Sequence, residues 1–383
     1  MRGGRHDRWL AAMVLCGSLL AGIPAASAGE PGRATGLDAP TRALILRHGP
    51  WPAPWRPDPS NRVSGRPEAI ALGRRLFFDA GLSPSGRVSC SSCHRPERAW
   101  SDGRPVGIGL AVGRRNTPSL LDVRHRRWFG WSGAGDSLWA QSIRPLLDTG
   151  EMGSSAAHIQ AFVTADGDLA RHYASVFQRQ VGAIAAEAVL VDVAKALATY
   201  QETLVSGRTA FDELRDALAS GDAQRAASYP AAGLRGLVLF VGRAGCSRCH
   251  AGASFTDDSF HAGTVDGLEP VTGTVDRGRG EGLEQLAASR FNRAGAFNDA
   301  AERRVPWTAA DLEPGAALLG AMRAPTLRNV ARTGPYMHDG RLTSLDEVVR
   351  RHRSGEGKLA ESDILDLVRF LETLNDRTPP RRD

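Results

Sequence analysis

Two Cys-x-x-Cys-His motifs constrain this chain more than any other feature of its sequence. One lies at residues 90–94 and the other at residues 246–250, and together they contain every cysteine except Cys16. Each motif is typical of covalent haem c attachment, in which two thiols form thioethers with the vinyl groups and the adjacent histidine ligates the iron. The predicted attachment residues are Cys90, Cys93, Cys246 and Cys249, and the predicted proximal iron ligands are His94 and His250. The sequence therefore predicts two haem c groups.

Zinc knuckles and redox dithiols are the alternative interpretations of the same cysteines. A structural zinc site would need a second Cys/His pair at short spacing after each motif, and neither motif is followed by one. We therefore favour haem for both motifs.

The first 28 residues have the organisation of a secretory signal peptide. A basic segment precedes an apolar stretch over residues 10–23, and Ala-Ser-Ala at 26–28 predicts cleavage near Ala28. The apolar stretch is short for a membrane span, and no later segment approaches one. Cys16 lies within it, but Leu15 precedes this cysteine where a lipoprotein signal needs a small residue, so a lipid anchor is the less favoured interpretation. Export together with haem attachment predicts a periplasmic protein without a membrane span.

The sequence around the first haem motif resembles the sequence around the second. In residues 69–94 and again in residues 232–250, a short apolar helix that contains glycine and ends in Leu-Phe precedes the motif. Such a segment is how a single-haem cytochrome c domain begins, so we infer an internal duplication. Helical periodicity is strong at residues 184–205, 344–352 and 362–375, whereas strand-like alternation is sparse.

These patterns predict a mainly α fold of two cytochrome c-like domains, each with one haem c. The predicted segments are a signal peptide at 1–28, an N-terminal domain with a crossing N-terminal arm at 29–225, and a C-terminal domain at 226–383. The formal net charge of the chain is +6. Because the arginines are scattered and haem propionates would offset most of this charge, we expect no nucleic-acid partner.

Several further segments resemble the bacterial di-haem cytochrome c peroxidase and MauG superfamily. They follow one another in the order expected for that family through nearly the whole mature chain. The segments are residues 72–79, 115–120, 131–141, 151–153, 325–330 and 335–340. The resemblance implies a mostly helical two-domain fold in which the N-terminal haem reacts with hydrogen peroxide and the C-terminal haem relays electrons.

The resemblance also implies roles for three residues near the haems. Glu151 matches the distal carboxylate that moves a proton between the two peroxide oxygens. Gln141 matches a distal amide that orients peroxide, and Trp131 matches the aromatic residue that carries electrons between the haems. Taken without the resemblance, Glu151 could be a surface carboxylate and Trp131 a core aromatic residue.

The resemblance implies a calcium ion between the two domains. Asn116, Thr333 and Pro335 match the positions that supply its amide and carbonyl oxygens, which suit a hard cation. Taken alone, Asn116 could simply be a turn residue.

Two departures from the family pattern concern iron ligands. Typical family members have a histidine in the loop before Arg-Asn that blocks the N-terminal iron, whereas this chain has Ile108 there. Isoleucine cannot ligate iron, which predicts an open sixth position. At the position of the distal ligand of the C-terminal haem stands His352, which predicts coordination by His250 and His352. The alternative is a solvated His352, with Met337 or Met322 as the ligand.

A third departure lies after Trp131, where Ser-Gly-Ala replaces the usual Asp-Gly-Arg. With the sequence at residues 128–141, this segment looks closer to the MbnH-like branch, in which peroxide is used to oxidise tryptophan in a partner protein.

The resemblance implies a periplasmic enzyme that uses hydrogen peroxide to form high-valent haem and oxidises a partner protein side chain by long-range electron transfer. The alternative is a cytochrome c peroxidase that takes electrons from a small cytochrome c or cupredoxin. A third class, a di-haem electron carrier, is disfavoured because a carrier normally keeps both irons six-coordinate.

Overall fold

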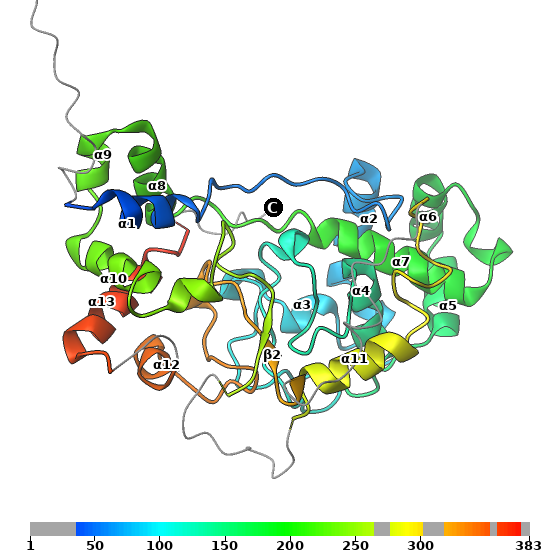
Figure 1. Ribbon diagram of the computed structural model, residues 1–383. Coiled ribbons are helices and arrows are strands. Elements are labelled where there is room, and N and C mark those ends of the chain that lie inside the picture. Colours follow the sequence, from blue (N-terminus) through cyan, green and yellow to red (C-terminus); the bar gives the residue numbers. More distant parts are fainter. Residues whose placement is uncertain (1–35, 264–275, 302–317, 353–357, 377–383) are drawn as a thin grey trace, which may run out of the picture.

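The computed structural model describes residues 36–263, 276–301, 318–352 and 358–376 of the chain (Figure 1). The predicted signal peptide and its cleavage site near Ala28 lie outside these residues. Helices form nearly all of the regular structure. In the described part, the strands are β1 (Phe260–His261) and β2 (Met322–Arg323), which pair antiparallel with Phe260 opposite Arg323. The predicted mainly α fold is confirmed.

The N-terminal half is built around the long helix α7 (Ala186–Gln201). Every residue from Val189 to Gln201 is buried, because other helices pack on several sides of α7 and leave none of these positions in water. The surrounding helices are α2 (Pro67–Phe78), α4 (Leu138–Leu147), α5 (Ala156–Ala165) and, against α2 and α5, α6 (Gly167–Phe177).

The C-terminal half has a second, separate hydrophobic core. Its central feature is the packing of α10 (Ala231–Val241) along α13 (Glu361–Glu372). Aromatic rings fill the space beneath this pair, with the Phe240 and Phe370 ring centroids 4.9 Å apart. The remaining helices of this half are α8 (Ala210–Ser220), α9 (Ala223–Ala227) and α12 (Leu345–Arg351).

The two halves repeat one helix crossing. A Cβ atom added at Gly73 of α2 would lie 2.0 Å from the carbonyl oxygen of Ala196 in α7. A Cβ atom added at Gly236 of α10 would lie 1.9 Å from the carbonyl oxygen of Asp366 in α13. Both glycines are followed by Leu-Phe and then by a haem motif. The internal duplication inferred from the sequence therefore corresponds to two close backbone contacts that only glycine allows.

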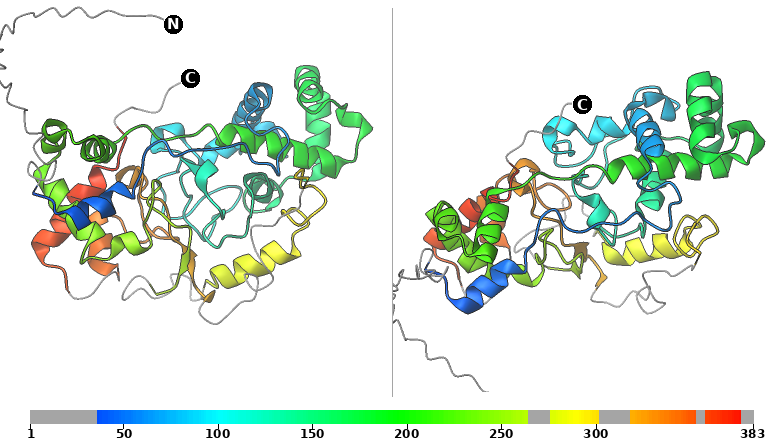
Figure 2. Two further views of the ribbon diagram at one scale, coloured as in Figure 1. Left: turned by 45° about the horizontal axis from the view of Figure 1, so that its top comes forward. Right: turned by 90° about the horizontal axis from the view of Figure 1, so that it is seen from above.

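The N-terminal arm connects the two cores. Helix α1 (Ala39–Leu46) packs against α8 and α10, and its Ile45 belongs to the C-terminal core. The chain then runs across to α2, and Val63 on the way belongs to the N-terminal core. In Figures 1 and 2 this crossing segment is the blue stretch of chain between the two helix clusters.

Helix α11 (Arg279–Ala288) and the turn after it lie against the N-terminal half, although they follow the second haem motif in sequence. Phe291 and Phe297 pack onto the N-terminal core. The buried Lys195 of α7 forms an ion pair with Asp299 at 2.6 Å. The two halves are thus interleaved, and the predicted division near residue 225 stays a prediction.

Candidate active site

The first cysteine motif forms the short helix α3 (Cys90–Cys93), which is capped at its start by Ser89 and Ser92. His94 follows directly, and its Nδ1 lies 3.1 Å from the carbonyl oxygen of Trp100. A histidine that binds metal through one nitrogen commonly donates the other N–H to such a carbonyl, which fixes the ring. Burial lowers the pKa of His94 and so favours the neutral, ligating form.

The second motif repeats this arrangement of the histidine. The Nδ1 atom of His250 lies 3.2 Å from the carbonyl oxygens of both Phe255 and Pro325. Burial, together with the charge of nearby His352, lowers the pKa of His250 to about 4. Both predicted proximal ligands are therefore neutral at pH 7 and have Nδ1 directed at the main chain.

His352 faces His250 across a cavity of about 640 Å³. The centroids of the two imidazole rings are 6.3 Å apart. Two metal–nitrogen bonds of about 2 Å, each with about 1 Å more to a ring centroid, require a separation of about 6 Å. The space between the rings therefore fits a haem iron. Cys246 and Cys249 line the same cavity, as covalent attachment requires.

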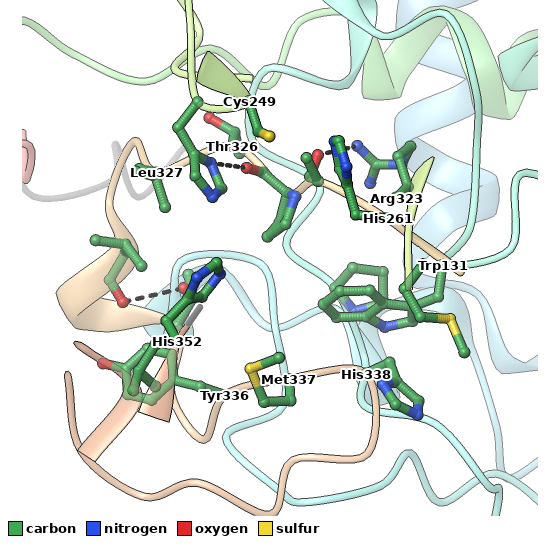
Figure 3. A pocket seen from close by; sticks show the side chains of 18 of the residues that line it. Trp131, Cys249, His261, Arg323, Thr326, Leu327, Tyr336, Met337, His338 and His352 are labelled. Atoms are coloured by element: carbon green, nitrogen blue, oxygen red, sulfur yellow. Dashed lines mark hydrogen bonds between the residues drawn. The ribbon is translucent and has the colours of Figure 1, made fainter. Parts of the chain in front are cut away.

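The local structure explains how His352 reaches this place. It ends α12, where its N–H donates to the carbonyl of Val348 at 2.8 Å. Ser344 caps the start of the helix, and its side chain accepts from the N–H of Glu347. Met322 and Met337, the alternative ligands, also line the cavity, and Figure 3 shows Met337 in the same pocket as His352. The geometry supports His352 as the ligand, which stays a prediction.

Trp131 extends from the N-terminal half into the same cavity (Figure 3). Its Nε1–H donates to the main-chain oxygen of Asn116 at 2.9 Å. Its own carbonyl accepts from the N–H of Arg323 at 2.9 Å, and its ring lies edge-on to His338 with centroids 6.5 Å apart. The indole is thus held in a fixed position beside the predicted second haem.

The loop that contains Ile108 lies beside the first cysteine motif. The Cys93 Sγ atom is 3.6 Å from the carbonyl oxygen of Ile108. The N–H groups of Leu110 and Ala111 donate to the carbonyls of Glu151 and Gly150 at 3.0 and 2.8 Å. These contacts fix the loop on the segment that contains Glu151. The Ile108 side chain is 42% exposed and offers no ligand atom.

Glu151 lies on the segment that holds the Ile108 loop, and its carboxyl has a shifted pKa. Glu151 is an exposed residue, and its pKa is raised, first by nearby protein atoms that partly desolvate the carboxyl and second by the negative charge of Asp148. Arg144 opposes the shift. The charge of Glu151 in turn contributes to raised pKa values for Cys90 and Cys93, which places the carboxyl near the first motif.

Gln141 lies on α4, which leads into the Glu151 segment. Its Oε1 atom is buried and has no hydrogen-bond partner among the described residues. A buried acceptor without a partner is costly in a folded protein and is commonly found where a further polar group binds. The Oε1 atom lies beside the loop that contains Gly130 and Gly135, and the role of Gln141 stays a prediction.

The three predicted calcium ligands, Asn116, Thr333 and Pro335, all line the large cavity. The described residues contain no group of three or more His, Cys, Asp or Glu side chains placed to hold a metal ion. A site made of amide and main-chain oxygens would not need such a group. Calcium therefore stays a prediction.

Sequence reasoning missed some residues that shape the site. Arg323 holds the Trp131 loop through its N–H and donates from Nη1 to Asp258 at 2.8 Å. His261 also lines the cavity. No local sequence pattern signals either residue, because Arg323 and His261 contact segments that are far away in the sequence.

Comparisons with known proteins show which family the chain resembles. A profile of the di-haem cytochrome c peroxidase family matches residues 67–219. The chain is 36% identical to the methylamine utilization protein MauG of Methylorubrum extorquens, over 80% of this chain and 78% of that protein. It is 29% identical to a cytochrome-c peroxidase of Pseudomonas sp. (strain SCT), over 82% of this chain and 83% of that protein.

Solved structures of two proteins resemble the fold of this chain. A MauG-like protein associated with microbial copper homeostasis aligns with a TM-score of 0.64 and 27% identity, over 87% of this chain and 96% of its own. The di-haem peroxidase BthA from Burkholderia thailandensis has the same fold, with a TM-score of 0.64, 24% identity, and coverage of 85% of this chain and 88% of its own. Among the described residues, no helix is long and apolar enough to cross a membrane.

Proposed function

The chain belongs to the di-haem cytochrome c peroxidase and MauG family and is a di-haem peroxidase-type oxidoreductase, and on this premise we propose that it uses hydrogen peroxide to oxidise a side chain of a partner protein by long-range electron transfer. The observation that carries the proposal is the Ile108 loop. It lies against the first cysteine motif and Glu151 and presents no side chain that could ligate iron.

Covalently bound haem would supply the redox chemistry of peroxide reduction at the first motif. His94 would hold this group, with its ring fixed by the Trp100 carbonyl. Glu151 would take a proton from one peroxide oxygen and return it to the other, which its raised pKa favours. Gln141 would orient peroxide through its amide.

Electrons for this reaction would come from the second site. His250 and His352 would hold the second haem between them. Trp131 lies at the edge of that cavity and is fixed by hydrogen bonds from both halves of the chain. It would pass electrons toward the first site one at a time, so the partner side chain need not enter the peroxide pocket.

The finer assignment is to the MbnH-like branch, with tryptophan as the oxidised residue. Two observations support it: the sequence at residues 128–141 and the likeness to a MauG-like protein associated with microbial copper homeostasis. A periplasmic location after cleavage near Ala28, a calcium ion at Asn116, Thr333 and Pro335, and domain limits at 29–225 and 226–383 belong to the same proposal.

The second candidate is a cytochrome c peroxidase that takes electrons from a small cytochrome c or cupredoxin. The similarity to a cytochrome-c peroxidase over 82% of the chain favours it. Both candidates share the peroxide site and differ in the electron donor.

Steady-state peroxide consumption with reduced small cytochrome c separates the two candidates. Our proposal predicts turnover close to the level without the donor, and a peroxide-oxidised protein that persists when no partner is present. Sustained turnover that saturates with cytochrome c concentration would instead establish the second candidate.

A further inference from the structure

Positive charges lie over most of the tryptophan rings that the structure describes. In each pair the charged group is within about 6 Å of the ring centroid, the range of a cation–π interaction. The pairs are Arg328 over Trp51 at 3.7 Å, Arg124 over Trp55 at 5.1 Å, Arg279 over Trp128 at 4.1 Å and Lys195 over Trp139 at 5.3 Å. Arg127, which is exposed to water, also lies over Trp128, at the longer distance of 5.5 Å.

Two described tryptophans differ from this pattern. Within the described residues, no Lys or Arg lies over the ring of Trp100 or Trp131. These are the two tryptophans next to predicted iron ligands. Trp100 accepts a hydrogen bond from His94, and Trp131 lines the cavity that contains His250.

A cation over an indole ring makes that ring harder to oxidise. The electron-rich face of the neutral ring attracts the cation. Loss of an electron gives the ring a positive charge, and the attraction becomes repulsion between like charges at the same distance. The reduction potential of the oxidised ring therefore rises. A tryptophan without a cation over its ring loses an electron more readily than one with a cation.

The pair of Arg279 and Trp128 is the one closest in sequence to the proposed electron route. Trp128 is 5% exposed and stands three residues before Trp131. Arg279 is 3% exposed, and its guanidinium lies 4.1 Å from the ring centroids of both Trp128 and Phe260. Burial of this kind strengthens the interaction, since little water screens the charge.

The position of the guanidinium is fixed by the loop after Trp131. Arg279 Nη1 donates to the carbonyls of Gly133 and Ser132 at 2.7 and 3.3 Å. Gly133 has φ of +65°, and a Cβ atom there would lie 2.5 Å from Arg279 Nη1 and 2.4 Å from the Phe260 ring. Only glycine allows this packing, so the sequence keeps Arg279 in contact with the loop.

We propose that Arg279 keeps Trp128 out of the electron-transfer route, so that oxidising equivalents pass through Trp131 and do not damage the protein itself. This inference rests on the proposed function, because it assumes that peroxide draws electrons through this part of the chain. Arg279 is a positioning residue that acts through Trp128 and contacts no reacting atom.

The damage that Arg279 prevents has a defined chemistry. If Trp128 lost two electrons and two protons and gained the oxygen of a water molecule, it would become hydroxytryptophan. The two electrons and two protons would reduce one peroxide to two water molecules. The net reaction converts tryptophan and hydrogen peroxide to hydroxytryptophan and water.

The test compares the wild-type holoprotein with Arg279→Met and Arg279→Lys, each treated with stoichiometric peroxide in the absence of a partner. Peptide mapping by mass spectrometry then measures the fraction of Trp128 that has gained oxygen. We expect a roughly tenfold or larger rise in Arg279→Met, in line with the strength of a desolvated cation–π pair. Arg279→Lys, which keeps the charge, should stay near the wild-type fraction.

Two results would overturn the inference in different ways. Wild-type levels of Trp128 oxidation in an Arg279→Met protein that consumes peroxide normally would refute it and leave the proposed function intact. No peroxide consumption by the wild-type holoprotein would remove the proposed function and this inference together.

Trp128→Phe gives a second measurement that does not depend on the folding of Arg279→Met. If Trp128 is outside the electron route, this variant should keep the wild-type lifetime of the peroxide-oxidised protein, followed by its optical spectrum. A several-fold longer lifetime would show that Trp128 already conducts electrons in the wild-type protein, contrary to the inference.

Discussion

At the scale of single residues, the proposed function depends mainly on Glu151 and on the pair of His250 and His352. Glu151 combines nearness to the first motif with a raised pKa. His250 and His352 combine a fitting separation with an Nδ1 contact that leaves one ring nitrogen of His250 free for iron. Replacement of Glu151 or His352 therefore has an expected effect that can be measured.

Replacement of Glu151 with Gln should slow the reaction with peroxide by roughly 10²- to 10⁴-fold, because an amide cannot take up and return the proton. Haem content and the ferric spectrum should not change. Stopped-flow mixing of each variant with peroxide measures the rate, and a rate within twofold of the wild type would exclude Glu151 as the proton carrier.

The pH dependence of the same reaction follows from the direction of the pKa shift. As the base, Glu151 must be deprotonated, and its pKa is raised. The wild-type rate should therefore fall as the pH decreases through a pKa above that of an ordinary glutamate. Glu151→Gln should lose this dependence, whereas an unchanged profile in the variant would assign the titration to another group.

His352→Ala should convert the second haem from low spin to high spin, because it removes the sixth ligand. Met337→Leu is the matched control and should leave the ferric spectrum as it is in the wild type. The reverse outcome, in which only the Met337 variant changes, would assign the ligand to methionine.

At the scale of elements, periodicity located the main helices. The patterns at 184–205, 344–352 and 362–375 correspond to α7, α12 and α13, with ends that differ by up to four residues. The pairing of β1 with β2 could not be predicted, because strands of two residues show no alternation. The contact of Arg279 with Trp128 had no signal either, since nothing local relates residues so far apart.

The repeated glycine contact predicts a large effect on stability. In Gly236→Ala, the new Cβ would collide with the Asp366 carbonyl, so α10 and α13 must separate. We expect a loss of about 1–3 kcal/mol or more in the free energy of unfolding. Gly233→Ala, on the same helix, meets only side-chain atoms at 3.2 Å or more and should be much less harmful, as chemical denaturation of both holoproteins would show.

At the scale of the whole molecule, the haem motifs and the family resemblance predicted the site residues, but the way in which the two halves interlock came from the structure alone. Trp131 of the N-terminal half enters the cavity of the second motif, and α11 from beyond that motif packs on the N-terminal half. These arrangements depend on contacts between distant segments, which neither periodicity nor spacing encodes.

The central claim is that one haem is open to peroxide while the other is closed by two histidines. Electron paramagnetic resonance of the oxidised protein as isolated, repeated after stoichiometric hydrogen peroxide, tests it most directly. We predict one high-spin and one low-spin ferric signal, both of which decrease when peroxide is added. Two low-spin signals that do not change on peroxide addition until one electron is supplied would contradict this claim. They would indicate a reductively activated peroxidase or an electron carrier.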